Sequence, residues 1–349
     1  MRMEPSVLSI SVPPAREPKV QLCSLVSEAS GESPISSAWA TERFLMMEVP
    51  LPWGYETLAS RQVPAGLKDL VYEFYAKGFS WGLLAIAPNP AYSVEGMTRI
   101  LEHTLMAEPL NAFAVRDFLV PTDNVVRFLA LYAENQEAPE LDAFQQPRSA
   151  DARDMFVCTH GAIDACCAKF GYPVFKELSR LAEETSMPTR IWRCSHFGGH
   201  RFAPTVMEMP SGRSWGRLRG PHMGGIINHD VLGLRHEAML PWVAEGEAML
   251  PWVAEGEAFA RGSWEWTRCE VTPSAVPEGP EVIGGTITLD YVHPDGETGS
   301  ITIDVIPDRV FETMGSSSSP ELHDAQQYRC ELVSVFPAGG LLDRMAGAE

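Results

Sequence analysis

Two histidines lie four residues apart in the segment CSHFGGH, residues 194–200, and both are candidates for chemistry. In a helix, His196 and His200 would share one face, but Gly198 and Gly199 together would cost about 2 kcal/mol relative to alanine. The segment is therefore predicted to be a tight loop, in which glycine lets the backbone approach another group closely. Imidazole is the commonest metal-ligating side chain. A metal centre, a catalytic pair of bases and a purely structural turn are all compatible with this pattern.

Three cysteines lie in an earlier segment, CTHGAIDACC, residues 158–167. Cys158 and Cys167 have eight residues between them, whereas structural zinc sites normally take cysteine pairs with about two to four residues between them. The wider spacing favours a loop around a larger group, such as a two-iron cluster. Two thiolates and two imidazoles would supply the four ligands of a [2Fe-2S] cluster, and neutral imidazoles in place of two thiolates raise the reduction potential, as in Rieske centres.

The elements around these two segments are predicted to bring them together. The short strand MFVC leads into the cysteine loop, an apolar stripe marks a helix within residues 169–186, and RIWRC is a second strand that ends at Cys194. A strand, helix, strand order implies a right-handed crossover, which makes the two strands parallel. Loops that follow parallel strands lie at the same carboxyl edge of the sheet, where α/β folds bind ligands. Cys158 and the histidine loop should therefore converge.

The preceding part of the chain reads as a smaller α/β unit. Apolar runs bounded by proline and glycine indicate strands, and apolar residues at helical spacing indicate helices. The expected elements are a strand at residues 44–49, a helix within 65–78 that ends on Gly78, a strand at 81–88, a helix at about 94–106 and a strand at about 125–132.

The length of 349 residues predicts two domains, because single hydrophobic cores usually stop growing before roughly 250 to 300 residues. The first residues are rich in Ser and Pro, and a polar stretch with two prolines follows the first α/β unit. The fold class is therefore α/β with two domains. The expected division is a loose amino-terminal arm at 1–38, an amino-terminal α/β domain at 39–134, a linker at 135–152 and a carboxyl-terminal domain at 153–349.

Two hairpins and a loop are predicted in the carboxyl-terminal domain. Residues 203–218 should form a hairpin that turns at 210–212, and residues 286–306 a second one that turns at 293–297. The run SSSS at 316–319 is expected to be a flexible loop.

An exact tandem repeat also lies in this domain. The decapeptide AMLPWVAEGE occupies residues 238–247 and again 248–257. Two copies are too few for a solenoid. Because proline is tolerated in the first turn of a helix, Pro251 is predicted to begin a second helical segment rather than to extend a first one. The domain is thus expected to carry a helical insert.

Composition excludes several classes of partner. Lys and Arg number 27 against 46 Asp and Glu, a formal charge of −19, so the surface should repel nucleic acids and anionic membranes. The first residues lack a continuous apolar region and a small-residue cleavage site, and no stretch approaches the roughly 20 apolar residues of a membrane helix. The seven scattered cysteines argue against a disulfide scaffold. We expect a cytoplasmic protein that binds neither nucleic acid nor membrane.

The two chemical segments also resemble a known family. CTHGAIDACCAKFGYPVFKEL, followed by WRCSHFGGHRFAPTVMEMPSGRSWGRL, is similar to the sucrase/ferredoxin-like family, most strongly over about residues 150–218. The resemblance implies that the carboxyl-terminal domain is a thioredoxin-like ferredoxin domain with a short mixed sheet. It also implies a [2Fe-2S] cluster whose ligands, carried over by position, are Cys158, Cys167, His196 and His200. The duplicated decapeptide departs from the family pattern.

Five neighbouring residues have open roles. Cys166 is the rival of Cys167 as a ligand, although only Cys167 keeps the eight-residue gap. His160 could replace a histidine ligand, donate a hydrogen bond to cluster sulfur, or simply belong to the loop. Asp164 is expected to cap the following helix, and Cys194 to face the sheet core. Arg201 is expected either to hold a carboxylate or to temper the charge of the cluster.

Three functions remain in competition. The first is an electron-transfer protein that exchanges single electrons with a redox partner protein, with proton uptake at an imidazole ligand on reduction. The second is a binding protein with a structural zinc site, against which the ligand spacing argues. The third is a thiol oxidoreductase that uses Cys166 with Cys167, or Cys158. The Cys-x-x-Cys pair of thioredoxin chemistry is absent from the sequence.

Overall fold

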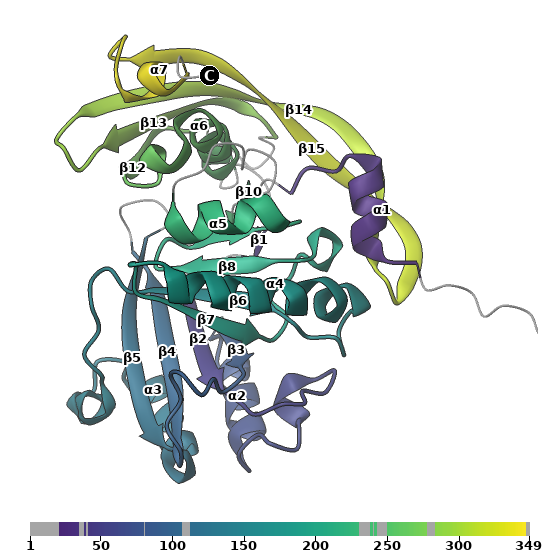
Figure 1. Ribbon diagram of the computed structural model, residues 1–349, viewed down its shortest axis with the longest axis vertical. Helices are drawn as coiled ribbons and strands as arrows, with labels where there is room; N and C mark the ends of the chain where they lie inside the picture. The colour runs from purple at the N-terminus through teal and green to yellow at the C-terminus, as the bar shows by residue number, and fades with distance from the viewer. Residues whose placement is uncertain are drawn as a thin grey trace, which may run out of the picture.

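The protein is described by a computed structural model (Figure 1). None of the helices within the described residues is long and apolar enough to cross a membrane. The described residues are 21–34, 38–39, 41–79, 81–106, 112–229, 238–239, 241–242, 250–277 and 283–346.

A mixed sheet forms the centre of the molecule. Among the described residues it has eight strands and the two-residue strand β10 at one edge, in the order β10-β9-β8-β6-β7-β3-β2-β4-β5. The pairs β2–β3 and β6–β7 are parallel and the other pairs are antiparallel. The strands are β2 (Arg43–Glu48), β3 (Gly82–Ile86), β4 (Met97–Leu105), β5 (Phe113–Pro121), β6 (Arg153–Cys158), β7 (Thr189–Cys194), β8 (Val206–Met209), β9 (Arg213–Trp215) and β10 (Ala238–Met239).

Within the central sheet, the pair β3–β7 joins the strands before residue 134 to those after 153. Strand β3 meets β7 at the single pair Ile86 and Cys194. Two further backbone bonds flank it, from Ala87 N to Arg193 O at 2.9 Å and from Ser195 N to Ala85 O at 2.7 Å. The strands expected in the two domains therefore belong to one sheet, and the first residue of the histidine loop is hydrogen-bonded to β3.

The sheet curls strongly at this junction. Four steps separate β6 from β4 in the strand order, which would be about 19 Å in a flat sheet, yet the rings of His103 on β4 and Phe156 on β6 are 5.7 Å apart. The apolar side chains on the inside of the curl consequently form one core from both halves of the sheet. This core includes Phe44, Met46, Leu84, Ile86, Phe156, Cys158, Cys167, Trp192 and Cys194.

Helices cover the other faces of the sheet. Helix α4 lies over β6 and β7, with α5 beside it (Figure 1). Helices α2 and α3 pack on residues of β2 to β5. The bounds are α2 (Leu67–Ala76), α3 (Val125–Glu134), α4 (Ala165–Glu184) and α5 (Gly220–Asn228), with the 3₁₀ turns η1 (Thr57–Ala59), η2 (Thr122–Asn124), η3 (Pro139–Phe144) and η4 (His200–Phe202).

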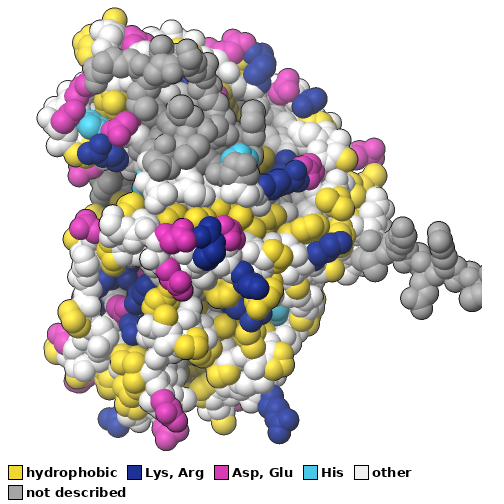
Figure 2. Space-filling view, viewed as in Figure 1, with side chains coloured by type: hydrophobic (Ala, Val, Ile, Leu, Met, Phe, Trp, Pro, Cys, Tyr) yellow, Lys and Arg dark blue, Asp and Glu magenta, His cyan; other side chains and the backbone are white. Residues whose placement is uncertain are grey.

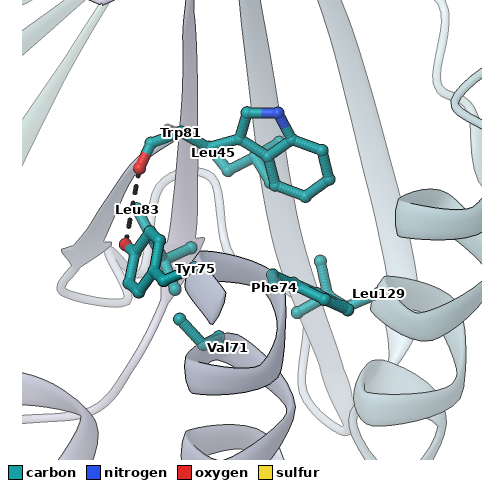
Figure 3. A pocket seen from close by; sticks show the side chains of 7 residues that line it. All are labelled: Leu45, Val71, Phe74, Tyr75, Trp81, Leu83 and Leu129. Atoms are coloured by element: carbon teal, nitrogen blue, oxygen red, sulfur yellow. Dashed lines mark hydrogen bonds between the residues drawn. The ribbon is translucent and has the colours of Figure 1, made fainter. Parts of the chain in front are cut away.

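A narrow apolar crevice lies between α2, α3 and strands β2 and β3 (Figure 3). Tyr75 donates a hydrogen bond to the carbonyl oxygen of Trp81 at its edge, at 3.4 Å. Its cavity volume is only about 10 Å³, no more than one water molecule needs. The crevice is a gap in packing rather than a ligand site. It is lined by Leu45, Val71, Phe74, Tyr75, Trp81, Leu83 and Leu129.

The type of secondary structure was predicted wrongly for two elements. The helix expected at about 94–106 is strand β4, and the strand expected at about 125–132 is helix α3. Strand β4 is covered on both faces, so Ile100 and Leu101 are both buried and no period of two marks it. In α3 the buried residues do follow helical spacing; they are Val125, Phe128, Leu129 and Tyr132.

The segment expected to be a linker packs against the sheet. Within residues 135–152, η3 buries Leu141 completely, and Gln145 forms an isolated bridge with Phe118 of β5. Residues 23–30, expected in the loose arm, form helix α1 (Cys23–Ser30) instead. The remainder of that arm up to residue 20 lies outside the described residues.

A separate antiparallel sheet follows at the carboxyl end, in the order β12-β13-β14-β15. Helix α6 lies within its curve, and α1 lies against β14 and β15 at its far end (Figure 1). The apolar residues of α6 connect this sheet to the core beneath α4 and α5. The bounds are α6 (Leu250–Trp266), β12 (Glu270–Ala275), β13 (Gly285–Val292), β14 (Thr298–Ser316), β15 (Ser319–Phe336) and α7 (Leu341–Ala346).

Both predicted hairpins are confirmed. Strands β8 and β9 pair antiparallel around 210–212, and β13 pairs with β14 around a turn in which His293 N donates to Glu297 O at 2.8 Å. The prediction of a flexible loop at 316–319 is wrong, because Ser316 pairs with Ser319 in the turn between β14 and β15. This turn reaches the start of α4, where Ser316 and Ser317 bind Asp164.

The two copies of the decapeptide differ in structure. Helix α6 begins at Leu250, which confirms the helical segment predicted at Pro251. In the first copy, the described residues form β10 and the two-residue strand β11 (Pro241–Trp242), which pairs with β1 (Ala38–Trp39). The prediction that the first copy is helical is therefore wrong for residues 238–239 and 241–242.

Candidate metal centre

Cys158 is the last residue of β6 and points into the core. Its backbone N–H donates to Thr205 O on the β8 side at 3.1 Å, and it pairs in register with Cys194 on β7. Both thiols are buried. Because β6 and β7 are parallel, the loops after Cys158 and after Cys194 leave the sheet at the same edge, as the sequence predicts.

Cys167 reaches this edge because α4 lies unusually close to β6. Asp164 caps the helix by accepting a hydrogen bond from Cys166 N at 2.9 Å, which confirms the predicted cap. One turn later, a Cβ placed on Gly171 would lie 2.0 Å from the carbonyl oxygen of Cys158. Only glycine therefore allows α4 to pack this closely against the end of β6. The Cys167 side chain is 1 % exposed at the resulting junction.

The histidine loop is held at its start and is irregular afterwards. Ser195 Oγ accepts a hydrogen bond from Ala85 N at 2.9 Å, which fixes the loop to β3. Gly198 and Gly199 then adopt φ values of 94° and 68°, a region that L-residues with side chains rarely occupy. The predicted tight loop is confirmed, and it ends in η4 at His200.

Three of the four predicted ligands come together. The Sγ atoms of Cys158 and Cys167 each lie 3.7 Å from His196 Nδ1, and the three donor atoms all lie within 4.8 Å of one another. The fourth, His200, lies beside His196, with ring centroids 4.9 Å apart and ring planes tilted by 34°. Its Nδ1 atom is buried, has no hydrogen-bond partner among the described residues and lies 3.5 Å from Asp164 Oδ2.

The two thiols of this group have opposite electrostatic environments. The pKa of Cys158 is lowered well below its ordinary value, first by a hydrogen bond from Cys167 and also by one from His196. The pKa of Cys167 is raised by its hydrogen bond to Cys158 and by burial. One thiolate is thus stabilised while the second sulfur retains its proton. Burial is the main cause that lowers the pKa of His200, which favours the neutral imidazole that binds metals.

His160 has a positioning role. His196 N donates to His160 Nδ1 at 3.3 Å, so the His160 proton lies on Nε2, which donates to Gly54 O at 2.8 Å. The ring also contacts the edge of Trp53, at 5.7 Å between centroids. With both nitrogens engaged, His160 is not available as a ligand. Of the alternatives left open by the sequence, these contacts support a loop residue, and in addition they tie the ring to the backbone of His196.

A second group lies on the other side of the start of α4 and includes Cys23, which the sequence did not predict as a ligand. The ligand atoms of Cys23, Asp164 and Cys166 lie within 4.8 Å of one another. Cys23 Sγ is 3.6 Å from Cys166 Sγ and 3.7 Å from each carboxylate oxygen of Asp164. Hydrogen bonds from Cys23 and Ser24 lower the pKa of Cys166 to about 6. The vicinal sulfurs of Cys166 and Cys167 therefore belong to different groups.

Arg201 lies between the histidine loop and α1. Its Nε donates to Glu32 Oε1 at 2.8 Å, and Glu32 also accepts from Ser27 and Thr313, each at 2.7 Å. Glu32 is 1 % exposed. Of the two roles expected for Arg201, holding a carboxylate is the one that the structure shows. Cys194 belongs to the apolar core, as expected.

Fold and site together define a mixed α/β protein with a buried Cys/His group that could hold a metal. The family model for sucrase/ferredoxin-like proteins matches residues 34–242, which include β1 to β11 and all four predicted ligands. The chain belongs to the sucrase/ferredoxin-like family. Helix α6 and the carboxyl-terminal sheet lie outside the matched residues. Comparisons with curated proteins and with solved structures found no match.

Proposed function

We propose that the protein is an electron carrier with a [2Fe-2S] cluster bound by Cys158, Cys167, His196 and His200. The observation that carries the proposal is the convergence of two buried sulfurs and His196 Nδ1 within 4.8 Å at one edge of the sheet. Membership of the sucrase/ferredoxin-like family supports it further. We also propose that β6, α4, β7, β8 and β9 form a thioredoxin-like unit with a short mixed sheet, whose order β9-β8-β6-β7 accords with this.

The donor set suits this cofactor. Thiolates are the usual ligands of iron–sulfur clusters, and imidazoles replace two of them in Rieske-type centres. The buried Nδ1 of His200 has no hydrogen-bond partner among the described residues, so its lone pair would be available to coordinate iron. A cluster bound here would supply one-electron redox chemistry at a raised potential. Uptake of a proton at an imidazole would then make the potential fall as pH rises.

In this proposal, the cysteine side and the histidine side of the site have different roles. Cys158 and Cys167 are 1 % exposed and keep the sulfur side away from water, whereas the His200 side chain is 19 % exposed. Electrons and protons would therefore pass on the histidine side. His160 holds the backbone of His196 in place, and Ser195 fixes the loop to β3.

In this proposal, the protein exchanges electrons with a redox partner protein. It acts in the cytoplasm. The whole chain carries a net charge of −19. On the face shown in Figure 2, acidic and basic side chains are nevertheless interspersed, with hydrophobic side chains between them. A partner that docks on this face would therefore meet charges of both signs rather than a field of one sign.

A structural zinc site is the second candidate, and one distance favours it. Tetrahedral zinc with ordinary bond lengths would place a sulfur and a nitrogen ligand about 3.6 Å apart, and the two sulfurs lie 3.7 Å from His196 Nδ1. The eight-residue gap between the cysteines and the family membership favour the cluster instead.

Metal analysis with visible and EPR spectra of anaerobically purified full-length protein distinguishes these candidates. The proposal expects about two iron and two sulfide per chain, a brown oxidised form and an EPR signal after one-electron reduction. A colourless protein with one zinc per chain would replace it with the structural zinc site.

A further inference from the structure

The second cysteine group has a different character from the metal centre. Cys23 and Cys166 are both fully buried, and their sulfurs are 3.6 Å apart although the residues are 143 positions apart in the chain. We propose that Cys23 and Cys166 form a reversible disulfide that joins α1 to the start of α4. This proposal stands independently of the cluster.

Asp164 argues against a metal ion in this group. Four N–H and O–H groups donate to its carboxylate: Cys166 N at 2.9 Å, Ser317 N at 2.7 Å, Ser317 Oγ at 2.8 Å and Ser316 Oγ at 2.9 Å. A carboxylate has about four lone-pair sites, and these bonds engage all of them. The carboxylate therefore caps α4 and holds the turn between β14 and β15, which leaves the two sulfurs of this group without a free third ligand among the described residues.

The placement of the sulfurs suits a disulfide. They are already in van der Waals contact and come from two helix starts, because Cys23 is the first residue of α1 and Cys166 the second of α4. Cys23 N donates to Ser317 Oγ at 3.0 Å, and Ser24 Oγ donates to Cys166 Sγ at 3.3 Å. These contacts fix both backbones, so closure needs mainly side-chain rotation toward the bonded S–S length of about 2.05 Å.

Access to the sulfurs requires α1 to open locally. This helix has eight residues, too few to be stable apart from the contacts that it makes with the rest of the fold. It lies at the end of the carboxyl-terminal sheet against β14 and β15 (Figure 1). Short peripheral elements open at a lower free energy than the core does, and such opening exposes Cys23 and Cys166 together.

The oxidant class is a hydroperoxide, for which the reaction balances. One sulfur attacks a peroxide oxygen, the O–O bond breaks, and a sulfenic acid and one water form. The second sulfur then attacks the first, the S–O bond breaks and a second water leaves. In sum, two thiols and one hydrogen peroxide give one disulfide and two waters, and the two electrons pass from sulfur to oxygen. A dithiol reductant reverses the oxidation by thiol–disulfide exchange.

Peptide mapping of the full-length protein tests the proposal. Anaerobically purified protein is treated with hydrogen peroxide at one equivalent per chain, alkylated under denaturing conditions and digested with trypsin. We expect peptide 20–43, which contains Cys23 alone, to be linked to peptide 154–169, with a mass about 2 Da below the sum of the two peptides. Tandem mass spectrometry should place the link at Cys166, and dithiothreitol should separate the peptides.

Matched variants give the controls. The linked peptide should be lost in Cys166→Ser and retained in Cys269→Ser, whose cysteine lies outside both groups. Because the decisive map is made on the unmodified sequence, the test stands even where a variant fails to fold. The proposal is overturned if Cys23 remains free after oxidation, if it pairs with Cys158 or Cys167, or if Cys23 and Cys166 instead retain a zinc ion that protects both from alkylation.

Discussion

Two cysteine groups flank the first turn of α4, and they differ in their third member. Cys158 and Cys167 meet the imidazole of His196, whereas Cys23 and Cys166 meet the carboxylate of Asp164. His196 Nδ1 lies 3.7 Å from each of the two sulfurs, while the carboxylate of Asp164 is already hydrogen-bonded to the backbone and to serines. Proximity of ligand-type atoms is thus a weaker criterion for a metal site than the lone pairs that remain available.

The largest expected effect is the loss of metal from the first group. Cys158→Ser should reduce bound iron to a small fraction of the parent value, because it removes a buried thiolate for which a hydroxyl is a poor substitute. Iron per chain and the visible spectrum measure this. Cys330→Ser, at a cysteine in neither group, should keep the parent content. Equal iron in both variants would contradict the assignment of the ligands.

Exchange of a histidine ligand should change the potential rather than the occupancy. His196→Cys should retain the cluster and lower its reduction potential by on the order of 100 mV or more, because an added thiolate charge stabilises the oxidised form. Spectroelectrochemical titration gives the value. An unchanged potential in a protein with full iron content would show that His196 is not a ligand.

The close packing of α4 against β6 should affect metal binding by the first group more than the contacts of the second group. Gly171→Ala inserts a Cβ 2.0 Å from Cys158 O and should lower the free energy of unfolding by about 2 to 3 kcal/mol, with weaker metal retention. Gly224→Ala in α5, where a Cβ meets nothing within 4 Å, should be stabilising by up to about 1 kcal/mol. Urea unfolding of both variants makes the comparison, and equal stabilities would show that the close contact is relieved at little cost.

The smallest expected effect on metal belongs to the second group. Cys166→Ser should leave iron content and reduction potential near the parent values, because Cys166 Sγ contacts Cys23, Ser24 and Ser317 rather than the first group. Parallel iron analysis of Cys166→Ser and Cys167→Ser decides between the two vicinal residues. Loss of iron from Cys166→Ser with retention in Cys167→Ser would reverse the assignment.

The spacing of residues close together in the sequence predicted much of the site. The eight-residue gap, the paired glycines and the strand, helix, strand order lie within about fifty residues, and they correctly predicted the convergence of Cys158 with the histidine loop. Cys23 carried no such signal. It reaches Cys166 only because α1 docks beside α4, with Arg201 and Arg217 bound to the segment around Glu32.

The errors in predicting the fold from the sequence also came from long-range contacts. Strand β4 is buried on both faces, so its apolar residues do not alternate, and a pattern without period does not separate a strand from a helix. The serine run at 316–319 has the composition of a free loop, yet its hydroxyl and backbone donors are bound by a carboxylate 152 or 153 residues away. Composition describes what a segment can do alone, and long-range partners change it.

The sequence by itself determined the chemical types at the site, the loop required by Gly198 and Gly199, and the parallel strands that bring Cys158 and His196 to one edge, because each depends on residues close together in the chain. Tertiary structure decided the rest. The clearest case is the duplicated decapeptide: Pro241 and Trp242 form β11 beside β1, whereas the identical Pro251 and Trp252 lie in α6. Identical residues have identical propensities, so only the different partners, a strand in one copy and the curve of a sheet in the other, account for the difference.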